Sequence, residues 1–221
     1  TPTIPVLSNE NYVYTIAPQI ATTSIPANTN ITGYIKSVTY FDGLGRAKQS
    51  IAIRQSATNK DIVTHIEYNS LGLQEKEYLP YVPTTTGDGF IKTGALSSTN
   101  NYYNTPAYGN TTNPYSQKTI EISPLNRILE QAAPGNDWKM GTNNVQGKGY
   151  TNGQTIKFDY GTNLSTEVKS YSATTVFTSS NYYEPTLANN GNYAVKTLSK
   201  TTTKDENWLS TQSNLKDHTT E

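Results

Sequence analysis

The chain has 221 residues, which is enough for one large domain or for a segment of a longer repeat protein. Hydrophobic residues make up 33% of it, while Thr, Asn and Ser together number 76 and Tyr 17, a composition typical of many short strands with polar faces. Lys plus Arg and Asp plus Glu each number 17, so the formal net charge is zero and no basic block predicts a nucleic-acid-binding surface.

The first part of the chain predicts a lead-in followed by two hairpins. Residues 1–33 are rich in Pro, Thr and Asn, and their only strand-like run, 12–16, is expected to add an edge strand. Residues 34–81 then predict two antiparallel hairpins, with the alternation of apolar and polar side chains clearest at 61–68.

Turns with a common pattern of residues punctuate these strands. The first turn is the most complete, and it is built from Tyr40, Phe41, Asp42, Gly43, Leu44, Gly45 and Arg46. Asp-Gly and Gly positions supply the positive φ that a tight hairpin turn requires. The second turn follows Tyr68 and has Asn69 and Gly72, whereas the third has Asn126 followed by Arg127. We expect Gly43 or Gly45 to hold a positive φ.

Residues 34–133 are expected to form the first group of hairpins, interrupted at 82–115 by a long polar insertion. A structureless loop of this length is uncommon in a compact domain, so the insertion is expected either to pack irregularly on the surface or to carry function. Strands are expected to resume at 116–122 and 127–133. No window predicts a helix, because Pro, Gly and β-branched residues interrupt every candidate.

Residues 134–221 are expected to hold further hairpins. Residues 155–160 and 167–171 read as a pair joined by a Gly-Thr-Asn link, and 193–198 read as a strand that leads into a turn at 205–207. The chain stops inside the strand expected to follow that turn, which indicates a fragment of a longer protein. The predicted fold class is therefore all-β, with repeated antiparallel hairpins and almost no helix.

The first turn resembles the Tyr-Asp-x-x-Gly-Arg core of YD repeats, the building unit of rearrangement-hotspot (Rhs) proteins. Residues 204–209 look like a further copy, and 77–81 and 129–135 are similar to the domain at the start of large secreted Rhs-type proteins of gliding, type IX-secreting bacteria. The resemblance covers roughly residues 10–215. It implies that the hairpins form part of a spiralling sheet, as a shell or a solenoid.

The spacing of the turns agrees with a repeat. Gly72 follows Gly45 by 27 residues, Asn126 follows Gly45 by 81, and Asn207 follows Asn126 by another 81. Periods of roughly 20–50 residues are typical of repeat proteins, in which one unit cannot bury its apolar face alone. No clear copy occupies the intermediate positions between Gly72 and Asn126.

No pattern of residues predicts an enzyme, a cofactor or a metal site. The only histidines, His65 and His218, are far apart in the sequence, and Cys is absent, so the usual N and S ligands of zinc are missing. Asp88 and Asp137 offer oxygen ligands for calcium, but no regular calcium-binding loop surrounds them. We expect His65 to be an ordinary sheet residue.

The polar residues of the turns have structural interpretations. Asp42 is expected to accept backbone N–H bonds within its own turn. Arg46 and Arg127 are expected to pair with a carboxylate or a carbonyl on the neighbouring hairpin, to which their planar guanidinium groups are suited.

The resemblance implies a non-enzymatic structural module at the amino-terminal part of a secreted or cell-surface Rhs/YD-repeat protein, whose β-shell encloses or displays a carboxy-terminal cargo such as a toxin. The expected partners are the remaining repeats and cargo of the same polypeptide, together with secretion or cell-surface proteins. Neither a nucleic acid nor a membrane span is expected. We expect an extracellular location after removal of a signal peptide. Such a shell predicts Tyr40, Tyr68 and Phe158 on its inward stripe.

The alternative hypothesis is a carbohydrate- or protein-binding adhesin module. Tyr102 and Tyr103 lie between asparagines, and Tyr182 and Tyr183 lie between Asn181 and a Glu, so that each pair offers rings for stacking on sugars. This hypothesis predicts that the four rings are exposed in a row. Tyr beside Asn in a loop is also an ordinary way to fix that loop on a sheet.

Overall fold

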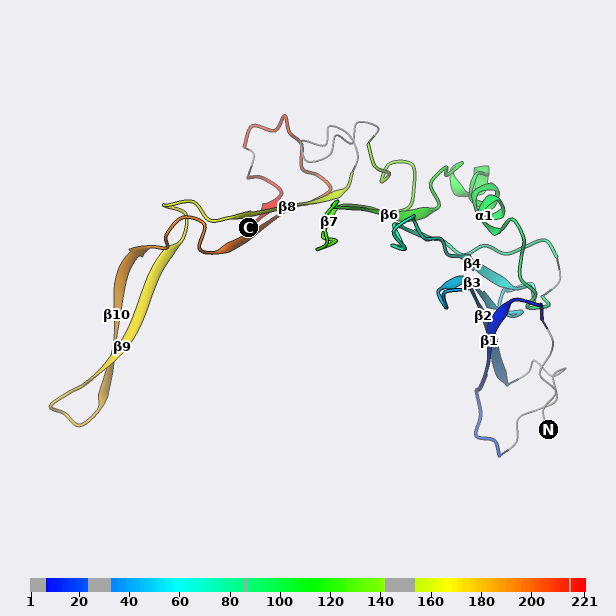
Figure 1. Ribbon diagram of the computed structural model, residues 1–221, viewed down its shortest axis with the longest axis horizontal. Helices are drawn as coiled ribbons and strands as arrows, with labels where there is room; N and C mark the ends of the chain where they lie inside the picture. The colour runs from blue at the N-terminus through cyan, green and yellow to red at the C-terminus, as the bar shows by residue number, and fades with distance from the viewer. Residues whose placement is uncertain (1–6, 24–32, 86, 142–153, 215) are drawn as a thin grey trace.

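The computed structural model describes residues 7–23, 33–85, 87–141, 154–214 and 216–221. Antiparallel strands dominate these residues, which confirms the all-β class expected from the composition. In Figure 1 the strands follow one another along an arc, with α1 on the outer side of the arc.

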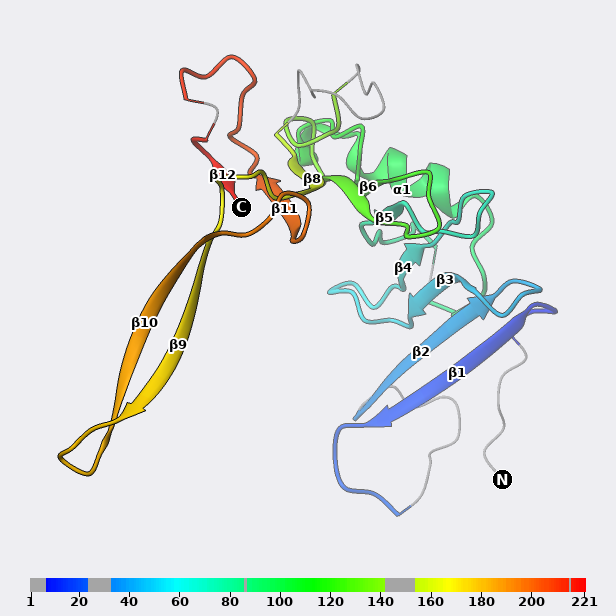
Figure 2. The same ribbon diagram turned by 60° about the vertical axis from the view of Figure 1, so that its left-hand side comes forward.

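The first sheet has four strands in the order of the sequence: β1 (Asn11–Pro18), β2 (Tyr34–Phe41), β3 (Ala47–Ala52) and β4 (Ile62–His65). Each pairs antiparallel with the next, and β1 is the edge strand that residues 12–16 predicted. Figure 2 shows β1 and β2 as long neighbouring ribbons. Lys36, Val38 and Tyr40 alternate with more exposed residues along β2, so one face of this sheet is buried and the other is open.

The buried face of the first sheet carries the core of the molecule. Val38, Ile51 and Val63 from three adjacent strands are completely buried. Residues of the 82–115 insertion and of α1 (Ala95–Tyr103) cover them, with Ile91, Ala95 and Tyr102 in contact with this cluster. The insertion therefore packs on the sheet as an outer layer.

The helix α1 differs from the expectation that no window forms a helix. Its sequence is rich in Ser, Thr and Asn, which favour helices only weakly. Gly94 precedes it in the left-handed conformation, and Ala95 and Thr99, one turn apart, are buried against the sheet. Packing on the core stabilises this helix, as is usual for short helices. A 3-10 turn, Pro106–Tyr108, follows it.

The second sheet has six strands in the order β12 (Thr219–Thr220), β11 (Ser199–Lys204), β8 (Ile156–Thr162), β7 (Ile128–Ala132), β6 (Tyr115–Ile120) and β5 (Lys76–Tyr78). Strands β6 and β7 form the hairpin predicted at 116–133. Single bridges join Ile66 to Glu77 and Val63 to Tyr81, so β4 leads on to β5 and the second sheet continues the row begun by the first (Figure 1).

Strands β9 (Lys169–Phe177) and β10 (Tyr183–Asn192) form a separate hairpin that projects from the row (Figures 1 and 2). The prediction that residues 155–160 pair with 167–171 is wrong, because β8 pairs with β11 and β9 pairs with β10. Asn163 explains the difference: its buried side chain accepts the N–H groups of Thr197 and Leu198, at 3.1 and 2.9 Å. The segment 193–198, expected to be a strand, is held at this crossing instead.

Candidate functional site

The first turn is a three-residue loop with its positive φ at Gly45. The Asp42 N–H donates to the Arg46 carbonyl at 2.8 Å, and the Gly45 N–H donates to the Asp42 carbonyl at 3.1 Å. Gly45 has a φ of +77°, which confirms the expectation for this pair of glycines. The geometry is that of a hairpin loop in which a left-handed residue follows a type I turn.

The Asp42 carboxylate organises the same turn. It accepts the backbone N–H groups of Leu44 and Arg46, both at 2.9 Å, and the Arg46 Nε at 2.8 Å. These bonds, the backbone N–H of Arg46 first among them, hold the pKa of Asp42 below its ordinary value. Asp42 therefore acts inside its turn, as the sequence analysis expected.

The second turn repeats this arrangement with an amide in place of the carboxylate. The Asn69 N–H donates to the Leu73 carbonyl and the Gly72 N–H to the Asn69 carbonyl, both at 2.9 Å, and Gly72 has a φ of +78°. The Asn69 side-chain oxygen accepts the N–H groups of Leu71 and Leu73 at 2.9 Å. The Asn69 amide oxygen thus accepts the same two backbone N–H groups that the Asp42 carboxylate accepts in the first turn.

The third turn is longer and takes its carboxylate from Glu121. The Glu121 N–H donates to the Arg127 carbonyl at 3.0 Å, and Asn126 adopts a φ of +50°. The Arg127 Nε and Nη2 each donate to the Glu121 carboxylate at 2.8 Å, a bidentate pair. The hydrogen bonds from Arg127 are the largest cause that lowers the pKa of Glu121 to about 2. Sequence reasoning missed Glu121, since it lies before the turn residues that the repeat pattern identified.

Each of the two arginines also stacks on a tyrosine of the next hairpin or strand. The Arg46 Cζ lies 4.5 Å from the centre of the Tyr68 ring, and the Arg127 Cζ lies 4.4 Å from the centre of the Tyr160 ring. The expectation that both arginines pair with a carboxylate or a carbonyl of the neighbouring hairpin is therefore wrong. Their carboxylates lie in the same turn, and the contact with the next unit is a cation–π interaction. We call these two contacts the cation–π links.

The structure places the three residues of the predicted inward stripe differently from one another. Tyr40 is completely buried beneath the insertion, and its hydroxyl donates to the Gly89 carbonyl at 2.7 Å. Burial raises the pKa of Tyr40 to about 12. Tyr40 thus faces the insertion that covers the first sheet, whereas Tyr68 and Phe158 are half-buried.

The two tyrosine pairs lie on separate elements. Tyr102 and Tyr103 belong to α1, where their rings pack against each other and against Tyr108, with centroids 4.9–5.2 Å apart. Tyr182 and Tyr183 lie at the end of the β9–β10 hairpin and are 55% and 68% exposed. Figure 1 shows α1 and this hairpin at opposite ends of the arc, so the four rings do not form one row.

The insertion is tied to the first sheet by polar residues that sequence reasoning missed. The completely buried Asp61 carboxylate accepts the N–H groups of Asp88 and Gly89 at 3.2 and 2.9 Å. Gln49 on β3 exchanges two hydrogen bonds with the backbone of Lys92, at 2.8 and 3.0 Å. Neither residue stands out in the sequence, because its partner lies more than 25 residues away in the chain.

Gly89 permits the close approach of the insertion. It has a φ of +73°, and a Cβ atom added to it would lie 2.7 Å from the Ile53 Cδ1. An L-residue at this position would therefore meet both backbone strain and a clash.

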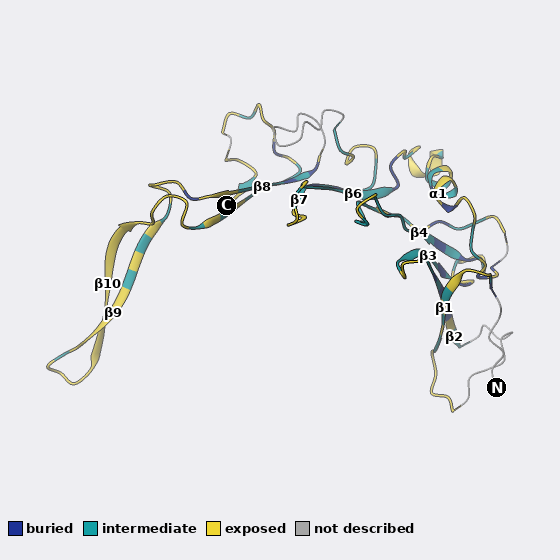
Figure 3. Ribbon diagram, viewed as in Figure 1, coloured by how far each residue is buried: buried dark blue, intermediate teal, exposed yellow. Residues whose placement is uncertain are grey.

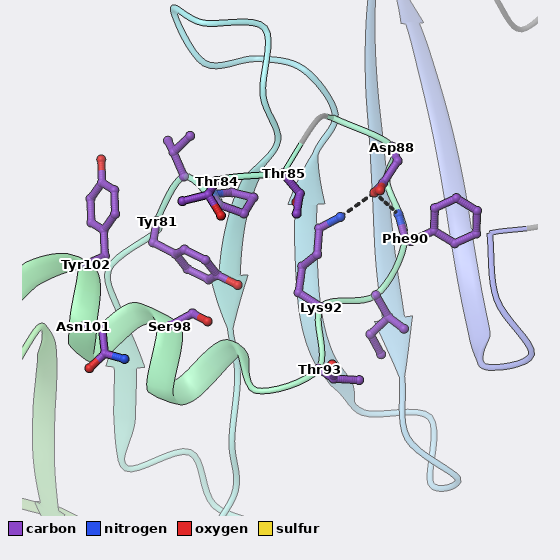
Figure 4. Close-up of a pocket in the computed structure, with 13 residues that line it drawn as sticks. Tyr81, Thr84, Thr85, Asp88, Phe90, Lys92, Thr93, Ser98, Asn101 and Tyr102 are labelled. Carbon is purple, nitrogen blue, oxygen red and sulfur yellow. Dashed lines mark hydrogen bonds and ion pairs between the residues drawn. The ribbon is translucent and has the colours of Figure 1, made fainter.

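A cavity of about 610 Å³ opens between α1 and the part of the insertion that precedes it. Its walls come from residues 81–85, from 88–93 and from one face of α1. In Figure 4 the side chains of Ser98 and Asn101 approach it from the helix, while Thr93 and Lys92 approach from the insertion. The rings of Tyr81 and Tyr102 also line it.

A buried polar trio joins β7 and β8. Glu130 lies opposite Lys157 in the register, and its carboxylate accepts the Thr155 hydroxyl at 2.5 Å. The Lys157 Nζ donates to the Thr155 carbonyl at 2.9 Å. Burial raises the pKa of Glu130 and lowers that of Lys157, the direction expected when charged forms lose water.

Residues considered as metal ligands are engaged in other contacts. The His65 Nε2 lies 3.6 Å from the Glu67 carboxylate, and the His218 Nδ1 lies 3.1 Å from that of Asp205. Asp88 forms an ion pair with Lys92. No group of three or more His, Asp or Glu side chains that could hold a metal ion occurs among the described residues. Within the same ranges no helix is long and apolar enough to cross a membrane.

Comparison with known proteins gives one family. The model of a domain of unknown function, DUF6443, matches residues 14–152, which include the first sheet from Tyr14 onward, the insertion, α1 and strands β5 to β7. No curated protein and no solved structure matches the chain.

Proposed function

The chain belongs to the DUF6443 family, and we propose that it is a non-enzymatic structural module within a larger secreted or cell-surface protein. The cation–π links carry this proposal. They join the turn of one unit to the next unit at two separate places in the row, Arg46 to Tyr68 and Arg127 to Tyr160. A contact that recurs between successive units is what a repeat array uses to stack them.

The continuity of the strands supports the same proposal. Strands β1 to β8 follow one another in the order of the sequence, and bridges connect the first sheet to the second. Each hairpin therefore has the preceding and the following unit as its neighbours. Such an arrangement extends by adding further hairpins at an edge.

We infer from the resemblance of residues 40–46 to the YD-repeat core that the larger protein is of the Rhs type. In that case the row of hairpins begins a spiralling β-shell that encloses or displays a carboxy-terminal cargo such as a toxin. The remaining repeats and the cargo would be the partners of this module, and export would place it outside the cell. In this proposal Arg46 and Arg127 are structural residues: each pairs with a carboxylate of its own turn and contacts a tyrosine of the next unit.

An antibody against this chain tests the proposal in the organism that makes it. We expect a polypeptide much larger than the 24.3 kDa of these 221 residues, found in the medium or at the cell surface. Hydrogen exchange then compares the chain alone with the full polypeptide. The amides of β11 (Ser199–Lys204) should gain protection in the full polypeptide, while those of β2 stay the same. A 24 kDa product inside the cell, with equal protection in both forms, would contradict the proposal.

A further inference from the structure

We propose that the cavity between α1 and the preceding part of the insertion binds a neutral, hydroxyl-rich ligand, namely a short glycan. The inference goes beyond the structural role proposed above and does not depend on it. The cavity volume of about 610 Å³ lies within the range of small-molecule sites, roughly 300–1,000 Å³, and suits one or a few sugar rings.

The charges at the cavity point to a neutral ligand. Among the described residues, Asp88 and Lys92 are the only charged side chains that line it, and they form an ion pair with each other. The Lys92 Nζ lies a further 3.4 Å from the buried Asp61 carboxylate. An anionic ligand would have to compete with two carboxylates for this one ammonium group, so the cavity favours a ligand without charge.

The uncharged polar side chains at the cavity are available for hydrogen bonds. Thr84, Thr93 and Asn101 line it, and in the part of the chain that the structure describes their side chains make no hydrogen bond to protein. Hydroxyl and amide groups both donate and accept, as sugar hydroxyls do. They come from three different segments, so they surround a ligand on more than one side (Figure 4).

An aromatic ring in a fixed orientation completes the site. The half-buried Tyr102 lies 6.4 Å from Tyr81 and 5.2 Å from Tyr108, measured between ring centroids, and its hydroxyl accepts that of Tyr108 at 3.0 Å. A ring held in this way offers an apolar face to the C–H groups of a sugar without losing side-chain freedom on binding.

Two of the three walls are tied to the core. The segment 88–92 is held by Asp61 and Gln49, and α1 is held by the buried Ala95 and Thr99. A preformed cavity of this kind binds with little cost in loop ordering. Of the four tyrosines named for stacking in the adhesin hypothesis, Tyr102 lines this cavity, whereas Tyr182 and Tyr183 lie on the projecting hairpin.

Nuclear magnetic resonance tests the proposal with the 221-residue chain. Neutral oligosaccharides, such as cello-, chito- and manno-oligosaccharides, are added at millimolar concentration, with oligogalacturonate as the acidic comparison. We expect at least one neutral oligosaccharide to shift the amide signals of residues 82–85, 90–93 and 98–102. Asn101→Ala should weaken that binding about tenfold, since tenfold corresponds to the loss of a good hydrogen bond, whereas Tyr182→Ala should leave it unchanged.

The variants are chosen so that a loss of fold is recognised. Asn101 is exposed, so Asn101→Ala should preserve the spectrum of the first sheet, and Thr93→Val provides a second, isosteric change. The proposal is overturned if no neutral oligosaccharide shifts these signals, or if the acidic one binds instead. It is equally overturned if peptides are the only ligands that bind, or if both variants bind as the original chain does.

Discussion

A left-handed backbone position recurs in three turns of the molecule, at Gly45, Gly72 and Asn126. Gly and Asn are the residues that tolerate this conformation at least cost. The acceptor that organises each turn is more variable: it is the carboxylate of Asp42, the amide of Asn69 and the carboxylate of Glu121. The backbone conformation is therefore more constant than the side chain that supports it.

The two glycines of the first turn should respond differently to the same substitution. Gly45→Val should lower the free energy of unfolding by more than about 1 kcal/mol, because a β-branched residue is strained at a φ of +77°. Gly43 does not share this positive φ, and a Cβ there would meet no atom within 4 Å. Gly43→Val should therefore cost less than about 0.5 kcal/mol. Urea unfolding of both variants measures this, and equal effects would contradict the assignment of Gly45.

The ion pair of Glu121 and Arg127 should make the free energy of unfolding depend on pH in the acidic range. The pKa of Glu121 is about 2 in the folded chain and ordinarily 4.5, so the pair stabilises the fold fully above pH 4.5. That stabilisation should decline as the pH falls from 4.5 through 2, because the proton must displace Arg127.

Urea unfolding across this pH window compares the chain with two variants. Glu121→Gln should flatten the acid decline. Glu184→Gln should leave it unchanged, since Glu184 is exposed on β10 and forms no ion pair within the described ranges. An unchanged decline in Glu121→Gln would show that other carboxylates cause it.

The β9–β10 hairpin is the most exposed element of the molecule (Figure 3). The register places most of its apolar side chains on one face of the hairpin: Tyr171, Ala173, Phe177, Tyr183, Pro185 and Leu187. The opposite face is mostly polar, with a hydrogen bond between Thr174 and Thr186 at 2.8 Å. A two-stranded hairpin with an uncovered apolar face is marginally stable in water.

Hydrogen exchange should therefore separate this hairpin from the first sheet. The amides of β9 and β10 should exchange much faster than those of β2 and β3. Phe177→Ser combined with Leu187→Ser should change the free energy of unfolding by less than about 0.5 kcal/mol and reduce the binding of a hydrophobic dye. By contrast, Val38→Ala in the core should cost roughly 2 kcal/mol. Equal protection of the β9 and β2 amides would contradict the expectation that the β9–β10 hairpin is only marginally stable.

The hairpins of the first half were predictable because their signals are local. Alternating side chains and Gly or Asn turns indicated β2, β3, β6 and β7 together with their connections. The pairing of β8 was not predictable in this way, since its partner β11 follows the β9–β10 excursion and depends on the buried Asn163. Likewise, α1 and the insertion take their structure from contacts with the sheet, through Asp61 and Gln49, which no short window of sequence reveals.

Across the whole molecule, buried apolar side chains are concentrated around the first sheet. The first sheet, the insertion and α1 hold most of the completely buried apolar residues, while the second sheet buries polar ones such as Glu130 and Lys157. Figure 3 shows exposure increasing toward the β9–β10 hairpin. The molecule is thus a compact, covered region that continues into a row of strands with little cover.

The cation–π links also bear on how such a protein can be recombined. Arg46 and Tyr68 belong to consecutive units, and so do Arg127 and Tyr160, so neither member of a pair keeps its partner when one unit is exchanged alone. A chimera that joins two related chains should be cut after the tyrosine and not after the arginine turn. The segment that can be grafted intact therefore does not coincide with one hairpin. It runs from a turn that carries an arginine to the tyrosine that this arginine contacts.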